Sequence, residues 1–244
     1  MGAFTLRWPR ALAQALLPCS CALCGELAPD PVCAPCTQRY AGGGGPRCPR
    51  CANPLGPGET AGQACGACIA GEPAFDATLA ALDYAAPLDA LVLGLKFGAR
   101  LPLAPWFGHL LRDAVLAQPG WPLPDLLCPV PLGPRRLSER GFNQALEIAR
   151  PLGRMIGVPV QARLATRAVE TVAQSGVTPR ERARNIRGAF AVAPAMAALI
   201  DGRHVGVVDD VMTSGHTLNE LAATLKAAGA ARVSNLVFAR TPPH

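Results

Sequence analysis

Residues 204–217 read His204-Val-Gly-Val-Val-Asp-Asp-Val-Met-Thr-Ser-Gly-His-Thr217, and this stretch decides the fold. An apolar run typical of a buried strand ends at two adjacent carboxylates, Asp209 and Asp210, and a hydroxyl-rich loop then leads into a helical pattern. Ligands of open α/β sheets bind at the carboxyl ends of the strands. The free backbone N–H groups of such a loop, with the dipole of the following helix, favour an anion. The stretch therefore predicts a site for a phosphorylated ligand whose hydroxyl groups, or an accompanying metal ion, meet the two carboxylates.

The chain around this stretch alternates between strand and helix patterns. Strands are expected at 75–84, 126–130, 158–164, 204–208 and 233–239, and helices at 88–97, 102–118, 143–156 and 217–228. Asn143 is the expected N-cap of the third helix, and Gly229 is expected to end the last one. Alternation of this kind predicts an α/β domain built on an open, mostly parallel sheet.

The 244-residue chain contains ten cysteines, nine of them between residues 19 and 68. Eight of these nine form Cys-x-x-Cys pairs, namely Cys21/Cys24, Cys33/Cys36, Cys48/Cys51 and Cys65/Cys68. Two such pairs can hold one Zn²⁺ in a tetrahedral four-cysteine site. We expect two structural zinc ribbons, the first four of these cysteines forming one site and the last four the other. Interleaved pairing also satisfies the spacing, and Cys19 is an alternative to Cys21.

A secreted disulfide framework is the rival interpretation of these cysteines. It requires export, yet residues 1–18, an amphipathic segment with two arginines and a short apolar run, contain no small-residue cleavage site. We therefore expect a cytoplasmic protein whose thiolates bind zinc. No run of 18 or more apolar residues occurs, so insertion into a membrane is not expected. Cys128, apart from the rest, is expected to be a buried small hydrophobe.

The formal net charge of +6 is unevenly distributed. Residues 135–190 hold eleven arginines against four carboxylates, whereas residues 1–74 are close to neutral. Arginine is the forked donor that suits phosphate oxygens. The stretch indicates either a site for a polyanion, whether a phosphorylated small molecule or a nucleic acid, or an arginine-biased composition with solvated helix faces. Charge alone does not separate these two interpretations.

Residues 207–217 resemble the phosphoribosyl pyrophosphate (PRPP) signature of type I phosphoribosyltransferases. From Cys21 to Arg240 the chain is similar to the ComF competence-protein family, whose pattern after the cysteine pairs includes Tyr84…Leu95-Lys96-Phe97, Pro129-Val-Pro131, Arg140-Gly-Phe-Asn-Gln144, Thr171-x-x-Gln174 and Arg184-Asn-x-x-Gly-Ala-Phe190. The resemblance implies a type I phosphoribosyltransferase-like α/β fold, with an open, mostly parallel sheet and a hood segment, preceded by small zinc-ribbon modules. The implied parts are an N-terminal amphipathic segment (1–18), a double zinc ribbon (19–74) and a phosphoribosyltransferase-like domain (75–244), with 75–100 as hood and 166–187 as flexible loop.

The resemblance also implies roles for individual residues. Asp209 and Asp210, the catalytic pair, would bind the ribose hydroxyls of PRPP, and Mg²⁺ would bridge pyrophosphate and ribose oxygens. The 5′-phosphate would be held by the loop residues Thr213, Ser214, Gly215, His216 and Thr217. Candidates for contacts with the leaving pyrophosphate, from its loop and the flexible loop, are Arg135, Arg136, Arg140, Gln174, Arg180 and Arg184. Lys96 is the candidate from the hood.

The function implied by the resemblance is Mg²⁺-dependent transfer of phosphoribose from PRPP to an unidentified acceptor, with release of pyrophosphate, linked to DNA uptake in natural competence. Two other functions stay open. One is a non-catalytic sensor of PRPP or a nucleotide on the same fold. The other is a competence factor whose zinc ribbons dock single-stranded DNA or a helicase-like protein. The acceptor and the oligomeric state are left open.

Overall fold

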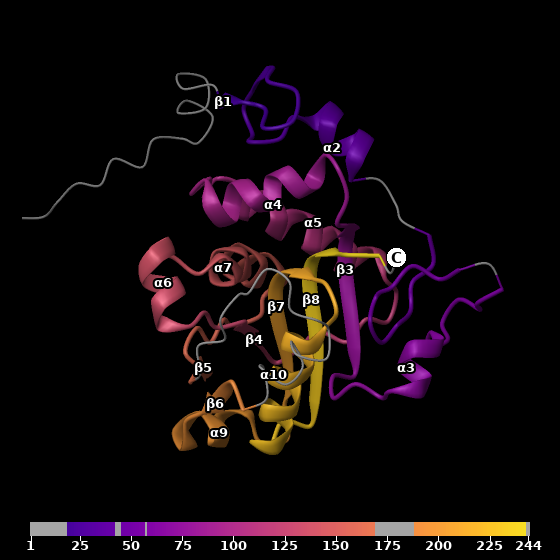
Figure 1. Cartoon of the computed structure of the whole chain (residues 1–244), viewed down its shortest axis with the longest axis vertical. Coiled ribbons are helices and arrows are strands. Elements are labelled where there is room, and N and C mark those ends of the chain that lie inside the picture. Colours follow the sequence, from indigo (N-terminus) through magenta and orange to yellow (C-terminus); the bar gives the residue numbers. More distant parts are fainter. Residues whose placement is uncertain (1–18, 42–44, 57, 169–187, 243–244) are drawn as a thin grey trace, which may run out of the picture. The chain divides into compact units, whose positions relative to one another are not determined.

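The computed structural model describes residues 19–41, 45–56, 58–168 and 188–242 (Figure 1). The chain divides into two compact units, one up to Gly42 and the other from Gly43 onward. Within the described ranges no helix is both long enough and apolar enough to cross a membrane.

The first unit contains the first cysteine quartet. Strand β1 (Cys19–Ser20) pairs antiparallel with β2 (Leu27–Ala28), and the short helix α2 (Ala34–Tyr40) follows. The buried apolar side chains described for this unit are Cys21, Ala28, Val32 and Cys36. These four side chains bury little apolar surface, and a metal bound by the cysteines would supply further folding energy to the described part of this unit.

The second unit is built on a parallel four-stranded sheet, which confirms the α/β prediction. Its strands lie in the order β3 (Ala77–Asp83), β8 (Arg232–Arg240), β7 (His204–Met212) and β4 (Leu126–Pro129), and every neighbouring pair is parallel. β4 pairs with β7 only as far as Val208, whereas β8 stays paired with β7 to Met212. The last residues of β7 therefore extend beyond the end of β4, which leaves a notch at the carboxyl edge of the sheet.

Helices cover both faces of the sheet. On one face α5 (Leu103–Ala117) stacks the Phe107 ring on Phe238 of β8, with ring centroids 3.6 Å apart. The neighbouring residue Val237 lies instead in the hydrophobic cluster that contains Leu218, Leu221 and Leu225 of α10 (His216–Ala227). Successive side chains of a strand point to opposite faces, so α5 and α10 lie on opposite faces of the sheet.

Of the remaining helices of this unit, the longer ones lie where the periodicity of the apolar residues predicts them. α4 (Leu88–Phe97) and α7 (Gln144–Ile156) occupy their expected ranges, and α7 packs on α5 and is capped by the Asn143 side chain, which accepts from the N–H of Ala145 at 3.0 Å. The short helices α6 (Pro134–Arg140) and α9 (Pro194–Ile200) were not among the expected elements. Each begins with proline, which suits the first turn of a helix because it needs no N–H there.

The strand expected at 158–164 was wrong. Only Val160 forms a bridge, with Leu127 of β4, and the chain then turns, the N–H of Leu164 donating to the carbonyl of Gln161 at 3.2 Å. The next strands, β5 (Ala165–Arg167) and β6 (Phe190–Val192), pair antiparallel. They bracket most of the segment expected to be a flexible loop, of which residues 169–187 lie outside the described residues.

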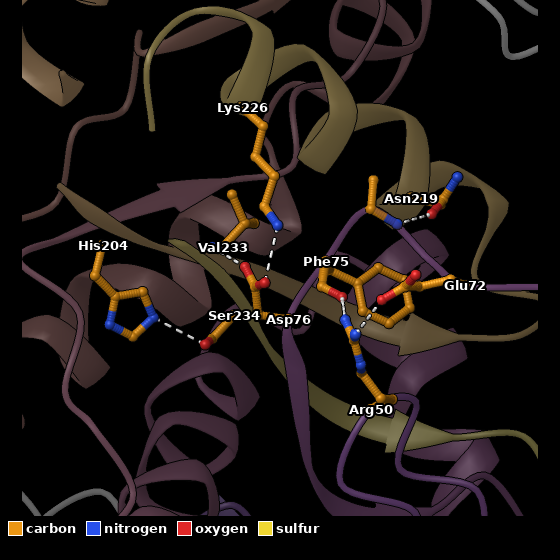
Figure 2. A network of polar contacts seen from close by, with 10 residues as sticks. Arg50, Glu72, Phe75, Asp76, His204, Asn219, Lys226, Val233 and Ser234 are labelled. Atoms are coloured by element: carbon orange, nitrogen blue, oxygen red, sulfur yellow. Dashed lines mark hydrogen bonds and ion pairs between the residues drawn. The ribbon is translucent and has the colours of Figure 1, made fainter. Parts of the chain in front are cut away.

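The second cysteine quartet belongs to the same compact unit as the sheet and packs against the sheet. Cys48, Cys51 and Cys65 belong to the hydrophobic cluster that also contains Phe75 and Leu221, and the short helix α3 (Gly66–Ala70) follows Cys65. The N–H of Thr78 in β3 donates to the carbonyl of Pro49 at 3.1 Å. Figure 2 shows Arg50 donating to the carbonyl of Phe75 and pairing with Glu72, at 3.0 and 2.7 Å. The second ribbon thus shares its core with the sheet.

Candidate functional site

A cavity of about 890 Å³ occupies the notch at the carboxyl edge of the sheet. Its walls come from the ends of β3 and β7, from α4, and from the segment 130–144 that follows β4. The lining residues are Tyr84, Lys96, Phe97, Ala99, Val130, Leu132, Arg136, Glu139, Arg140, Phe142, Gln144, Arg167, Asp209, Asp210, Val211, Thr213 and Thr217. This placement is the one expected for a ligand site in an open α/β sheet.

Asp209 and Asp210 form the acidic part of the cavity wall. They are 9% and 2% exposed, respectively. Oδ1 of Asp209 accepts from the N–H of Asp210 at 2.9 Å, and Oδ1 of Asp210 accepts from the N–H of Val211 at 2.8 Å. Burial and the neighbouring charge of Asp210 raise the pKa of Asp209 well above its ordinary value, against the opposing effect of Lys96. Two buried carboxylates in one wall are ready acceptors for ligand hydroxyl groups.

Lys96 reaches the acidic pair from α4. Its Nζ lies 3.0 Å from Oδ2 of Asp210. In the parallel register, Asp210 is level with Phe238, so its side chain points toward the face that carries α5 and the adjacent α4. The structure therefore brings the residue expected in the hood to the signature strand.

The loop after β7 has the features of an anion-binding loop. Thr213 and Thr217 line the cavity, and Gly215 is the N-cap of α10. Gly215 has φ +80°, a conformation that L side chains rarely adopt, and a Cβ at this position would lie 2.6 Å from the Met212 Cε, so this position favours glycine. Ser214 Oγ and His216 Nδ1 lie 3.0 Å apart and bond to each other, and neither residue is among those that line the cavity. The N–H groups of the first turn of α10 are thereby available to an anion.

The expected arginines differ in position. Arg136 and Arg140 line the cavity, whereas Arg135 is 73% exposed on α6 and pairs with Glu139 at 2.8 Å. The Arg140 guanidinium donates to Gln144 and lies 5.4 Å from the centre of the Phe97 ring. Burial lowers the pKa of Arg140, while Asp210 raises it. Gln174, Arg180 and Arg184 lie outside the described residues.

Several lining residues were not assigned to the site from the sequence. Tyr84, Phe97, Phe142 and Gln144 belong to the segments that carry the family resemblance, and that resemblance was a signal for them. Arg167 also lines the cavity and lies 5.5 Å from the centre of the Phe190 ring, across the β5–β6 pair. Arg167 belongs to the arginine-rich stretch and to the expected flexible loop 166–187, and these were the signals for it.

The two cysteine quartets are grouped in sequence order, which excludes the interleaved pairing. In each quartet, Cys21/Cys24/Cys33/Cys36 and Cys48/Cys51/Cys65/Cys68, all four sulfur atoms lie within 4.8 Å of one another, and Cys19 belongs to neither. The Cys24–Cys33 and Cys51–Cys65 sulfur pairs are 3.7 and 3.6 Å apart. A tetrahedron with Zn–S bonds of about 2.3 Å has edges of about 3.8 Å, so both quartets fit zinc.

Backbone N–H groups point at sulfur in both quartets. The N–H of Cys33 donates to Cys21 Sγ at 3.4 Å, and the N–H of Cys65 donates to Cys48 Sγ at 3.3 Å. Such donors stabilise thiolates, the form that binds metal. A closed four-cysteine site leaves no coordination position for substrate, so zinc here would supply folding energy and not catalysis. Cys128 is separate: it is buried, and burial raises the pKa of its thiol to about 12.

Comparison with known proteins agrees with both parts of the chain. The family described as "Double zinc ribbon domain" matches residues 12–69, and the family described as "Phosphoribosyl transferase domain" matches residues 140–243. The chain is 36% identical to "DNA utilization protein YhgH" of Salmonella typhi over 197 residues, covering 80% of this chain and 84% of that protein. It is 30% identical to "Competence protein F" of Haemophilus influenzae over 219 residues, covering 88% and 93%.

Proposed function

Because this chain belongs to the ComF family, which includes competence protein F and DNA utilization protein YhgH, we propose that its cavity binds PRPP and that the site transfers phosphoribose to an acceptor. The observation that carries the proposal is the arrangement of one cavity wall. There the buried pair Asp209 and Asp210 lies next to Thr213, Thr217 and the N-terminal turn of α10. A ligand that fits must combine hydroxyl groups with a phosphate, which a sugar phosphate does.

The ribose and its 5′-phosphate are assigned to this wall. The carboxylates of Asp209 and Asp210 accept hydrogen bonds from the 2′- and 3′-hydroxyl groups. The Thr213 and Thr217 hydroxyls and the N–H groups at the start of α10 bind the 5′-phosphate, since a helix N-terminus favours negative charge. Anchoring both ends of the ribose fixes the orientation of its anomeric carbon in the cavity.

The leaving pyrophosphate is assigned to the arginines of α6 that line the cavity. Arg136 lies in the first turn of α6 and Arg140 at its last residue, and their guanidinium groups suit phosphate oxygens. When bound with PRPP, Mg²⁺ supplies further positive charge for the pyrophosphate oxygens, and it is held largely by substrate and water. The charges of these arginines are most useful after the bond to pyrophosphate has begun to break.

The reaction is a substitution at the anomeric carbon. A lone pair of the acceptor forms the new bond to C1, and the C1–O bond breaks with its electron pair leaving on pyrophosphate. The acceptor proton passes to solvent. Positive charge develops on the ribose ring during this step, and the two carboxylates of the wall stabilise it.

A calorimetric titration of the full chain with PRPP, with and without Mg²⁺, tests the proposal. We expect binding of one PRPP per chain that is tighter with Mg²⁺ and is abolished in Asp210→Asn. Asp113→Asn is the matched control, because Asp113 is an exposed acid on α5 that pairs only with its neighbour Arg112 among the ion pairs of the described residues. Absence of binding heat with the wild-type chain at any attainable concentration contradicts PRPP binding.

Turnover is tested separately from binding. Release of pyrophosphate is measured with PRPP and Mg²⁺ in the presence of purines, pyrimidines or nucleic-acid fragments. Release that requires one acceptor class establishes a transferase and names the acceptor. Tight PRPP binding without release in any mixture supports the second candidate, a sensor of PRPP on the same fold.

The names of the relatives favour a role in handling DNA, and the arginine-rich stretch 135–190 provides charge for it. We propose that this role is coupled to the PRPP site and not carried by the nearly neutral cysteine-rich segment. Binding of single-stranded DNA is measured as a function of salt, because each neutralised phosphate steepens the dependence. If removal of residues 1–42 abolishes DNA binding, the ribbon in that segment is the DNA-docking element instead.

A further inference from the structure

The side chain of Arg240 connects the second cysteine quartet with the loop after β7. Arg240 ends β8 and is 6% exposed. Its Nε donates to the carbonyl of Cys51 at 2.9 Å, and its Nη1 donates to the carbonyls of Met212, at 3.0 Å, and Thr213. One planar guanidinium therefore joins the backbone of a metal-binding turn to the backbone of the proposed phosphate loop.

Packing provides a second connection between the same two places. The Met212 side chain is 2% exposed and belongs to the hydrophobic cluster that contains Cys48, Cys51 and Cys65. A Cβ on Gly215 would lie 2.6 Å from the Met212 methyl group, so the loop backbone lies close to this side chain. A displacement of the cysteine turn would therefore be transmitted to the loop through Met212, because closely packed side chains have no free space to absorb it.

A third connection runs through the chain that leaves the second quartet. The N–H of Ala74 donates to Oδ1 of Asn219 at 2.7 Å, a contact of the Asn219 side chain that is drawn in Figure 2. The N–H of Asn219 donates to the carbonyl of Gly215 at 2.8 Å. Asn219 lies in the first turn of α10, whose N–H groups would face the 5′-phosphate. The strand–loop–helix junction is thus tied to the second quartet at its start, at its glycine and at its first helical turn.

We infer that Arg240 is a positioning residue that couples zinc in the second ribbon to PRPP in the cavity. The inference rests on the proposed function. Zinc holds the turn at Cys51, where the following residue, Ala52, has φ +56°, a conformation that an L-residue rarely adopts without support. Arg240 passes this geometry to Thr213. Each ligand then stabilises the arrangement that the other needs, and such coupling is reciprocal by linkage.

Only the second quartet is expected to take part. The first quartet lies in a separate compact unit, and the described contacts of Arg240, Met212 and Asn219 all lie within the unit from Gly43 onward. The two sites therefore serve as an internal comparison in one polypeptide. Zinc in the second ribbon should respond to PRPP, and zinc in the first should not.

The first test is zinc release from the wild-type full chain, loaded with two Zn²⁺. Release to a chromogenic chelator is followed with excess Mg²⁺, with and without saturating PRPP. We expect PRPP to slow one of two release phases about tenfold, within the usual range of coupling between sites. Cys33→Ser and Cys65→Ser, each lacking one ligand of one site, assign the phases. Equal slowing of both phases, or of the first-ribbon phase alone, overturns the inference.

The second test is Arg240→Lys, which keeps the charge but loses the forked geometry. We expect PRPP affinity to fall about tenfold and the PRPP effect on zinc release to disappear, with two zinc ions still bound per chain. Arg50→Lys is the matched control for the guanidinium path, because Arg50 also ties the second ribbon to the chain but donates to Phe75 and Glu72 and not to the carbonyls of Met212 and Thr213. Coupling that persists in a folded Arg240→Lys variant contradicts the role of Arg240, and if that variant does not fold, the wild-type release experiment decides.

The two proposals fail in different ways. No PRPP binding to the zinc-loaded wild-type chain contradicts the proposed function and this inference together. PRPP binding that leaves both release rates unchanged contradicts the inference alone.

Discussion

Nζ of Lys96 lies 3.0 Å from Oδ2 of Asp210, so a residue of α4 forms an ion pair with the last part of β7. The Asp210 side chain is 3% exposed and that of Lys96 24%. A buried carboxylate is costly unless it is paired, and removing one partner of such a pair leaves an uncompensated charge. We interpret Lys96 as the residue that holds the Asp210 side chain in place at the cavity wall before ribose binds.

Lys96→Met, which retains much of the aliphatic stem, should lower the free energy of unfolding by about 1–3 kcal/mol, less than for a fully buried pair because Lys96 is partly solvated. Denaturant unfolding measures the change. The control is Lys226→Met, at the other lysine of the chain. Lys226 Nζ lies 2.8 Å from Oδ1 of Asp76, whose side chain is 28% exposed. Its loss should be at most about 1 kcal/mol. The double variant Lys96→Met with Asp210→Asn should recover part of the stability, and additive losses would contradict the pairing.

The raised pKa of Asp209 makes the free energy of unfolding of the ligand-free protein depend on pH. Because burial and Asp210 raise this pKa in the folded chain, Asp209 binds its proton more tightly when folded than when unfolded. The free energy of unfolding therefore falls as pH rises through the interval between the unfolded value, about 3.9, and the raised folded value. Asp209→Asn lacks this titration.

Denaturant unfolding of the wild type and Asp209→Asn at several pH values measures this effect. Both chains carry the same zinc ribbons, so the difference between them isolates Asp209. The variant should gain stability relative to the wild type as pH rises through the interval, although it loses PRPP binding. A difference that does not change with pH shows that Asp209 has an ordinary pKa in the folded chain.

Comparing Gly215→Ala with Gly157→Ala separates the effect of the contact with Met212 from the effect of backbone strain at a positive φ. Gly215 has φ +80° and Gly157 has φ +72°, but only at Gly215 would a Cβ meet a side-chain atom, the Met212 Cε at 2.6 Å. Both variants should lose about 1 kcal/mol or more of stability from the positive φ. Only Gly215→Ala should also weaken PRPP binding, by at least about tenfold, because the added Cβ and the Met212 methyl group beneath the loop must move apart. Calorimetry on both variants decides, and equal PRPP affinities would exclude a role for this close approach.

The parts of the site that are contiguous in sequence were the predictable ones. Asp209, Asp210 and Thr213 lie in one strand–loop–helix junction, so the local pattern was sufficient to predict that they would lie together at the carboxyl edge of the sheet, where they line the cavity. Arg240 and Cys51 are 189 positions apart, and no local pattern indicates that one would bond to the other. The contact between Lys96 and Asp210 likewise depends on how α4 packs on the sheet.

Which cysteine turns share a metal site was also not predictable from the sequence alone. The spacing of Cys21, Cys24, Cys33 and Cys36 identifies two metal-binding turns but not which turns meet. Turn pairing is decided by tertiary packing, here by the short β1–β2 pair in one unit and by contacts with β3 in the other. The strand expected at 158–164 failed for a related reason. Val158 and Leu164 are buried at its two ends, but only Val160 between them forms a bridge to a strand.

Thiol reactivity provides the last prediction, and it tests which cysteines bind zinc. With both sites loaded, eight thiolates are metal-bound, which leaves Cys19 and Cys128. Cys19 is exposed, whereas Cys128 is buried with a pKa of about 12, so it is a neutral thiol near pH 8. Iodoacetamide followed by peptide mass spectrometry should therefore modify Cys19 first and leave Cys128 unmodified in the folded chain.

Chelation should expose the first quartet to the reagent, and PRPP should protect the second quartet if it slows zinc release there. Modification of Cys21 in place of Cys19 in the loaded protein would show that the first site uses Cys19 as its ligand.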